Sequence, residues 1–121
     1  MWQTNGIIIS SFGYTLGLTG NRTALIETNH AAIHNYTWQY DALYRLTNET
    51  ITGTSPAGTL AYGYDFVGNR SVRTNISGSL GPTNQSLFAY DGLGRRVQII
   101  ELTNGVAAST NKYIWCGLEL C

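Results

Sequence analysis

The sequence is poor in charged residues, and that shortage excludes several classes of protein. Charged residues make up 12% of the chain, about half of their usual share, and the 7 basic side chains balance the 7 acidic ones. This composition excludes a charged disordered tail and disfavours a helical bundle or a coiled coil. A formal net charge of zero also disfavours binding to the phosphate backbone of nucleic acid, so we predict no nucleic-acid partner.

Cysteine and long apolar runs are also scarce. Cys116 and Cys121 are the 2 cysteines, too few for a disulfide framework or a zinc site, and we expect a buried thiol at the first and a frayed one at the second. No stretch approaches the roughly 18 consecutive apolar residues of a transmembrane segment, so we predict no membrane span. The first residues also lack the basic and apolar regions of a secretory signal peptide.

Abundant instead are the small polar residues that strands and turns favour. The chain contains 15 Thr, 10 Asn, 8 Ser and 14 Gly, and its 121 residues are the length of one domain. We therefore expect residues 1–121 to form one segment of β-sheet, with no separate second domain.

The most informative feature is an internal repeat built around a tyrosine–aspartate pair. Each of the 3 aspartates follows a tyrosine, in Tyr40-Asp41, Tyr64-Asp65 and Tyr90-Asp91. Two positions before these tyrosines stand further aromatic residues, namely Trp38, Tyr62 and Phe88. Three positions after the aspartates stand Tyr44, Gly68 and Gly94, followed by Arg45, Asn69 and Arg95. Such regular self-similarity is the signature of a repeat architecture.

Two weaker copies extend the series. Gly17 takes the aspartate position in the first, after Tyr14, and Cys116 takes it in the last, after Tyr113 and Trp115. The repeat positions are therefore 17, 41, 65, 91 and 116, separated by 24, 24, 26 and 25 residues. Two strands and two turns fill such a period, because strands run about 5–6 residues, whereas a helix pair needs more than about 30.

The predicted fold class is all-β, with repeated antiparallel β-hairpins that form a curved or spiralling sheet. Residues i and i+2 share one face of a strand, so we expect the aromatic pairs to stack, repeat upon repeat, along one face. Asn5-Gly6 and Asn104-Gly105 are strong hairpin signals. Pro56 and Pro82 fall in turns, where no ladder hydrogen bond is lost.

The tyrosine–aspartate series, with Gly-Asn-Arg or Gly-Arg-Arg behind it, resembles the YD repeats of the RHS/teneurin family. The clearest matches are residues 40–46, 64–70 and 90–96, and the likeness covers roughly Phe12 to Gly117. The structural repeat residues implied by this resemblance are Tyr40, Asp41, Tyr64, Asp65, Gly68, Arg70, Tyr90, Asp91, Gly94 and Arg95.

The resemblance implies a role within a larger assembly. In that family many repeats wind into a β-sheet that closes as a hollow shell, which encloses a toxin polypeptide in bacteria and serves adhesion at the animal cell surface. About four repeats are too few for such a shell, and the family's Asp-Pro-x-Gly self-cleaving segment has no counterpart here. We therefore expect a fragment of an extracellular or cell-surface parent, with the remaining repeats, an enclosed toxin polypeptide or glycans as partners.

The three aspartates carry the side chains that acid–base catalysis or a metal would use. We expect each instead to accept backbone N–H bonds in the turn after its strand, with Arg45, Arg70 or Arg95 adding a charge-assisted bond. His30 and His34 are expected to flank a turn rather than to bind a metal together. We therefore predict no catalytic, metal-binding or cofactor-binding residue, and no enzyme.

Three functions stay open on these grounds. The leading one is a non-catalytic structural segment of an RHS/YD-repeat protein, part of the wall of a β-shell. The alternative is an extracellular carbohydrate- or protein-binding adhesion module with an aromatic platform, and a hydrolase comes third. Because a short sheet exposes unpaired strand edges, the isolated chain is also expected to self-associate.

Overall fold

The computed structural model describes residues 2–4, 7–30, 32–54, 57–77 and 82–120, which form strands and turns without a helix. The described residues therefore contain no helix that could cross a membrane. The strands are β1 (Trp2–Thr4), β2 (Ile7–Leu16), β3 (Arg22–Asn29), β4 (Ala32–Tyr40), β5 (Leu46–Gly53), β6 (Gly58–Tyr64), β7 (Arg70–Ser77), β8 (Thr83–Tyr90), β9 (Arg96–Thr103), β10 (Val106–Lys112), β11 (Trp115–Cys116) and β12 (Glu119–Leu120).

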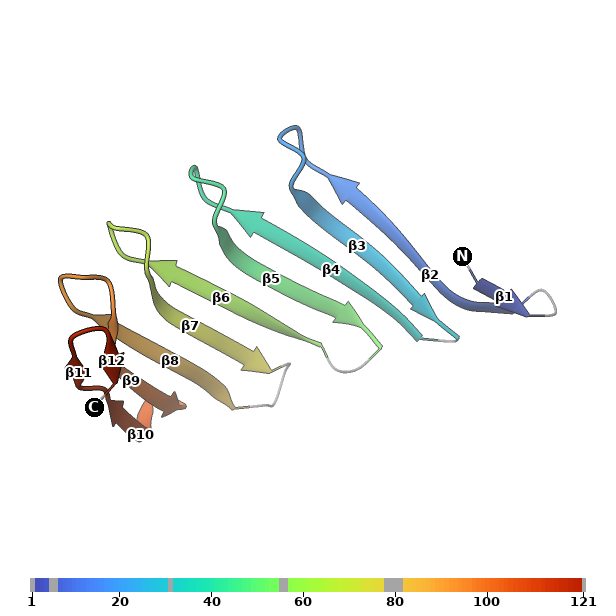
Figure 1. The fold of residues 1–121 in the computed structure, drawn as a ribbon. Helices are drawn as coiled ribbons and strands as arrows, with labels where there is room; N and C mark the ends of the chain where they lie inside the picture. Colours follow the sequence, from blue (N-terminus) through green and yellow to red (C-terminus); the bar gives the residue numbers. More distant parts are fainter. Residues whose placement is uncertain (1, 5–6, 31, 55–56, 78–81, 121) are drawn as a thin grey trace.

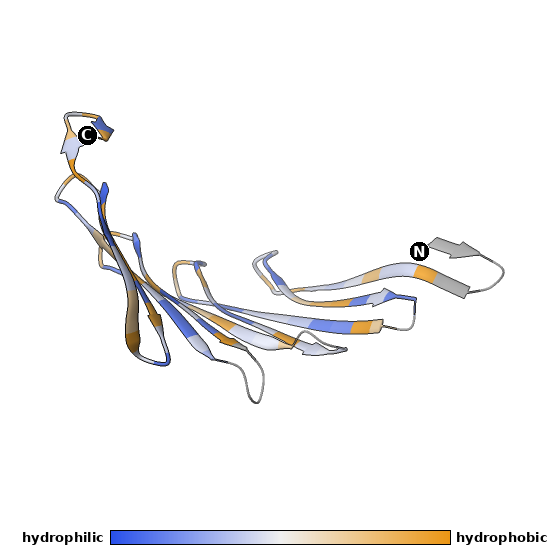
Figure 2. Cartoon of the chain, turned by 90° about the horizontal axis from the view of Figure 1, so that it is seen from below, coloured by the Kyte–Doolittle hydropathy of each residue, from blue (hydrophilic) through white to orange (hydrophobic). Residues whose placement is uncertain are grey.

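Strands β1 to β10 form one sheet in chain order, and each is antiparallel to its neighbours. Each strand is thus joined to the next as a hairpin, whereas β11 and β12 form a small sheet of their own (Figure 1). Seen from below, the large sheet is curved (Figure 2). These observations confirm the prediction of an all-β fold made of repeated antiparallel hairpins.

The large sheet is a single layer without a hydrophobic core. None of the described hydrophobic side chains is buried, and among the described residues only Ser86 is buried, at 9% exposure. The accessible surface of 8389 Å² compares with about 6400 Å² expected for a compact monomer of this mass. Stability must therefore come from strand pairing and from contacts between side chains of neighbouring strands.

The two faces of the sheet differ in chemistry. Pairing places Tyr14 opposite Leu25 and Leu25 opposite Tyr36, so the rings of β2 and β4 share a face. The same registers bring the rings of β6 and β8 to that face. The opposite face carries a row of mostly β-branched residues, which suit a pleated surface. In strand order this row is Thr15, Ala24, Thr37, Thr50, Thr59, Ile76 and Thr83.

The hairpin predicted at Asn104-Gly105 is confirmed. Both residues have positive φ, 51° and 80°, and they join β9 to β10, as a type I′ turn requires. The other predicted hairpin, at Asn5-Gly6, lies outside the described residues, as does Pro56. Pro82 directly precedes β8.

The last predicted copy of the repeat departs from the others. Cys116 lies inside β11, and Gly117, with φ of 71°, reverses the chain directly after that strand toward β12. In the other copies the residue with positive φ comes three positions after the repeat position, but here it comes one position after it. This allows a tight two-residue turn, so position 116 does not start the longer turn of the other copies. Cys116 is exposed and disulfide-bonded, and the prediction of a buried thiol was wrong. Cys121 lies outside the described residues.

Candidate functional site

The repeat residues lie in the turns that follow β2, β4, β6 and β8, and these turns are all on the same side of the sheet, at one end of the strands (Figure 1). In each turn the first residue's N–H donates to the carbonyl four residues later, and the N–H three residues later donates back, at 2.8–3.1 Å. The residue three positions after the first has positive φ in every copy: Gly20 (83°), Tyr44 (60°), Gly68 (94°) and Gly94 (74°). This is a type I turn closed by a left-handed residue, a common three-residue hairpin loop.

Asp41, Asp65 and Asp91 hold three of these turns in the same way. One carboxylate oxygen, Oδ1, accepts backbone N–H bonds from the residues two and four positions later, at 2.8–3.1 Å. The other oxygen, Oδ2, accepts a bond from the side chain of the residue four positions later. The bonds of each carboxylate stay within its own hairpin, so the three carboxylates do not converge on a shared centre.

The side chain at the fourth position after the aspartate distinguishes the repeats. Arg45 Nε lies 2.6 Å from Asp41 Oδ2, and Arg95 Nε lies 2.7 Å from Asp91 Oδ2. In the middle repeat that place belongs to Asn69, whose Nδ2 donates to Asp65 at 3.1 Å. Arg70, predicted as a partner of an aspartate, begins β7 and lies instead over the rings of Tyr62 and Phe88.

These bonds keep the aspartates ionised. The pKa values of Asp41 and Asp91 lie below the usual value, first because the backbone N–H of the arginine four residues later donates to the carboxylate, and also because its side chain does. For Asp65 desolvation is the largest single effect and raises the pKa. The backbone and side-chain bonds from Asn69 and its neighbours outweigh it, so that the pKa is again lowered. A lowered pKa means that folding favours the charged form.

A second series of hydrogen bonds links each repeat to the one before it. The hydroxyls of Tyr40 and Tyr64 donate to the carbonyls of Arg22 and Leu46, each at 2.8 Å. Tyr90 donates to Arg70 in the same way at 3.0 Å. The acceptor is always the first residue of the strand that follows the preceding turn. In the last copy the indole Nε1 of Trp115 donates to the carbonyl of Arg96 at 2.9 Å and replaces the tyrosine.

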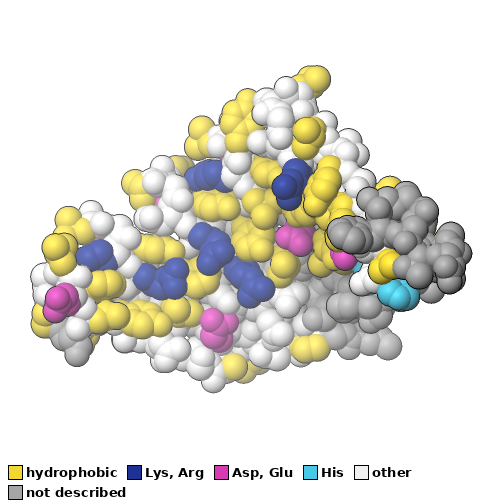
Figure 3. Space-filling view, turned by 45° about the vertical axis from the view of Figure 1, so that its right-hand side comes forward, with side chains coloured by type: hydrophobic (Ala, Val, Ile, Leu, Met, Phe, Trp, Pro, Cys, Tyr) yellow, Lys and Arg dark blue, Asp and Glu magenta, His cyan; other side chains and the backbone are white. Residues whose placement is uncertain are grey.

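Arginines, and not other rings, fill the space between successive aromatic side chains. Arg45 lies 4.5 Å from the ring centroid of Tyr64, and Arg95 lies 5.5 Å from that of Trp115. The cations at the starts of β3, β7 and β9 lie over rings of their own or the next repeat; the pairs are Arg22 with Tyr14, Arg70 with Tyr62 and Phe88, and Arg96 with Phe88 and Tyr90. In Figure 3 basic side chains alternate with hydrophobic ones across the surface.

The aromatic residues share one face of the sheet, as predicted, but the prediction that their rings stack on one another from repeat to repeat was wrong. The two ring contacts among the described residues, His34 with Tyr36 at 6.5 Å and Tyr36 with Trp38 at 6.0 Å, both lie within β4. Equivalent rings are two strands apart, about 9.5 Å, which exceeds the roughly 4.5–7 Å of a ring pair. Arg70 bridges that distance, since its guanidinium lies 5.8 Å from the ring centroid of Tyr62 and 5.2 Å from that of Phe88 in the next repeat. Of the two histidines that were predicted to flank a turn, His34 lies within β4 and His30 lies in the turn before that strand.

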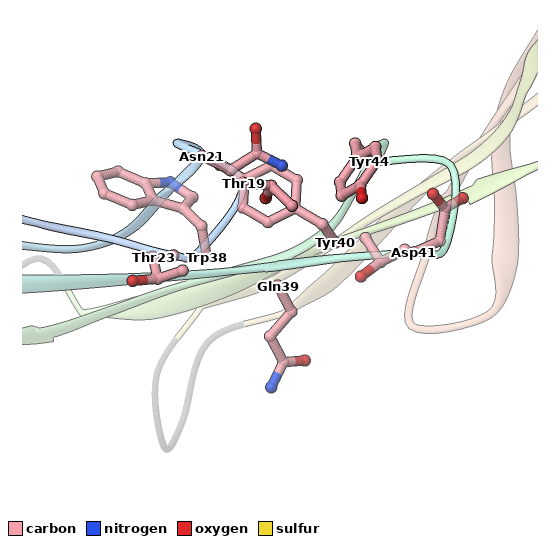
Figure 4. Close-up of a pocket in the computed structure, with 10 residues that line it drawn as sticks. Thr19, Asn21, Thr23, Trp38, Gln39, Tyr40, Asp41 and Tyr44 are labelled. Carbon is pink, nitrogen blue, oxygen red and sulfur yellow. The ribbon is translucent and has the colours of Figure 1, made fainter.

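Between the first two turns the surface is hollowed into an open notch of 530 Å³. Figure 4 shows the rings of Trp38, Tyr40 and Tyr44 on one side of the strand and the side chain of Gln39 on the other. The remaining lining residues come from both turns and the strands beside them: Gly17, Thr19, Asn21, Thr23, Asp41 and Thr47. The equivalent tyrosines of the next two repeats, Tyr64 and Tyr90, each have an arginine over the ring. Among the residues that the structure describes, no arginine lies over the ring of Tyr40.

Comparisons with known proteins find no match to this chain, neither among protein-family models nor among curated protein sequences. The role of the repeat residues is therefore argued from their own geometry. The predicted list of structural repeat residues included Arg70 but left out Arg22 and Arg96. Both stand five positions after a repeat position, as Arg70 does, and that shared spacing was the signal that could have identified them.

The tyrosine hydroxyl bonds between repeats predict a measurable loss of stability when one hydroxyl is removed. Tyr64→Phe deletes the bond to Leu46 and leaves a carbonyl without its partner, so we expect the free energy of unfolding to fall by about 1 kcal/mol. Tyr62→Phe is the matched control, because that tyrosine lies on the same strand and its hydroxyl forms no hydrogen bond with the described residues. Urea unfolding of both variants gives the comparison, and equal losses would contradict a specific link.

The lowered pKa values predict a loss of stability in acid. Their contribution is present above the unfolded carboxyl pKa of about 4 and is lost as the pH falls through the folded values. Melting temperatures measured from neutral pH downwards should therefore drop below about pH 4. The Asp91→Asn variant should have a lower melting temperature than the native chain at neutral pH, and its melting temperature should fall less in acid. Glu119→Gln, outside the large sheet, should follow the native curve; a parallel curve for Asp91→Asn would contradict the assignment.

Proposed function

We propose that the chain is a non-catalytic structural segment, a stretch of YD-repeat sheet that forms part of the wall of a β-shell or of an extracellular scaffold. The observation that carries this proposal is the recurrence of one closed turn after β2, β4, β6 and β8, with a carboxylate inside the last three and a guanidinium against the next ring in the second and fourth. The patterned side chains are used by their own hairpin or by the adjacent one. Such nearest-neighbour contacts are typical of repeat scaffolds.

The large exposed surface supports a place within a bigger assembly. A single layer leaves both faces open, and its area exceeds that of a compact monomer of the same mass. Leu18 and Phe66, at the turn tips, are fully exposed. Surfaces of this kind are normally covered by a partner or by more of the same chain. On the resemblance to YD repeats, that cover is further repeats or an enclosed toxin polypeptide.

A second candidate function, an extracellular carbohydrate-binding module, is favoured by one observation, the aromatic notch beside Tyr40. It is compatible with a structural role, because the notch occupies only the first two turns.

Mass spectrometry of the native gene product tests the structural proposal. We expect peptides of this sequence to belong to a longer polypeptide that continues the tyrosine–aspartate series. A mature, functional protein of these 121 residues alone would contradict it.

The open edges of the sheet predict self-association of the isolated chain. All residues of the terminal strand β10 are exposed, and an unpaired edge invites strand pairing between molecules. We expect sedimentation velocity to show oligomers that grow with concentration. Ala108→Pro should reduce them, because Ala108 sits at a bulge of β10 without a partner in β9, where proline breaks no ladder bond.

Ala42→Pro is the control for that substitution, since it follows Asp41 in a type I turn, a position that accepts proline. Its sedimentation should match that of the native chain. A clean monomer of the native chain at high concentration, or equal effects of the two prolines, would overturn the prediction.

A further inference from the structure

The notch between the first two turns lies where the first repeat lacks both the aspartate of the later turns and the arginine of the second and fourth turns. In the second and fourth turns, Arg45 and Arg95 lie over the ring of the following repeat. The residue at the same position of the first turn is Asn21, which is too short to cover the ring of Tyr40. The aspartate position holds Gly17. Among the described residues, the ring of Tyr40 therefore has no guanidinium over it, whereas Arg45 lies over Tyr64 and Arg96 lies over Tyr90.

Tyr44 gives the notch a third ring at a conformational cost. It has φ of 60° at a position where the other three turns have glycine. A bulky residue in the left-handed region is strained, and such strain is concentrated at functional sites. Its side chain is 60% exposed and lines the notch rather than packing in a core. The residue that bears this strain therefore forms part of the wall of the notch.

The charges around the notch decide between a cationic and a neutral ligand. In the second and fourth turns, the guanidinium that lies over the next ring is bound by the aspartate of its own turn, Arg45 by Asp41 and Arg95 by Asp91. Gly17 removes that carboxylate from the first turn. The one acidic lining residue, Asp41, is already paired with Arg45. A cation would find rings but no free counter-charge, whereas a neutral ligand needs none.

We propose that this notch binds a neutral sugar residue. The apolar C–H face of a pyranose packs on a flat aromatic ring, and Trp38, Tyr40 and Tyr44 offer three such rings in one cavity. The amide of Asn21 and the hydroxyls of Thr19 and Thr23 supply the donors and acceptors that sugar hydroxyls require. A few polar groups among aromatic walls are the usual composition of a small-molecule site. This site does not depend on the structural proposal.

Saturation-transfer difference NMR on the full chain tests the site, because it tolerates oligomers. The neutral probes are methyl glucoside, methyl galactoside and N-acetylglucosamine; arginine amide and tetramethylammonium are the cationic ones. We expect signal from at least one neutral sugar, with an affinity on the order of millimolar. Signal from a cation without any from a sugar, or no signal from any probe, would overturn the proposal.

Two substitutions locate the binding in the notch. Tyr44→Gly restores the residue found at the other turns, so it should keep or raise the melting temperature while weakening sugar binding by about tenfold. Asn21→Arg should cover the ring of Tyr40 from within the chain and abolish binding. These outcomes separate a binding role of Tyr44 from a structural one, which would lower the melting temperature instead.

Leu43→Ala is the matched control, since Leu43 is a neighbouring exposed turn residue, 71% exposed, that does not line the notch. Its sugar signal should equal that of the native chain. If Asn21→Arg also kept the native signal, the sugar would bind elsewhere and the assignment to this notch would be wrong.

Discussion

The spacing of strands is the constraint on which the rest of this structure depends. Equivalent side chains of successive repeats lie two strands apart, roughly 9.5 Å, which is too far for aromatic rings to touch. The chain bridges that distance with arginine, whose planar guanidinium can face a ring while its nitrogens bind a carboxylate. Arg45 does both, with Asp41 on one side and the ring of Tyr64 on the other. From the second repeat onward, each described repeat is thereby linked to the next without a hydrophobic core.

The same constraint explains why one end of every hairpin is uniform and the other is not. At the aspartate end the five residues of the turn keep one hydrogen-bond pattern, which in the second and fourth turns places an arginine over the next ring. At the far end the links between strands span 30–31, 54–57 and 78–82. Those links carry no part of the ring series. The links at the far end therefore vary in length, whereas each turn at the aspartate end keeps five residues.

The sequence predicted the strands well because their signals are local. Alternating aromatic residues, asparagine–glycine pairs and a constant period define hairpins without knowledge of distant contacts. The predicted stacking failed because it depends on a distance across two strands, which a repeat period does not contain. The prediction that Arg70 binds Asp65 failed for a similar reason. Asn69 and Arg70 are adjacent in sequence, and only the geometry of the turn selects Asn69 as the partner. The strain at Tyr44 was hidden because tyrosine gives no signal of positive φ.

A sheet stabilised by neighbour contacts can tolerate an imperfect repeat, and this makes a local cavity possible. In a close-packed core, removal of two large side chains would leave a costly void. Here the loss of the carboxylate at Gly17 and of the guanidinium at Asn21 leaves the first turn closed by the same two backbone bonds as the others. The second repeat keeps its hydroxyl link from Tyr40 to Arg22. A notch lined by three rings thus forms without loss of the scaffold, so one degenerate copy supplies both a strand pair and a surface with its own chemistry.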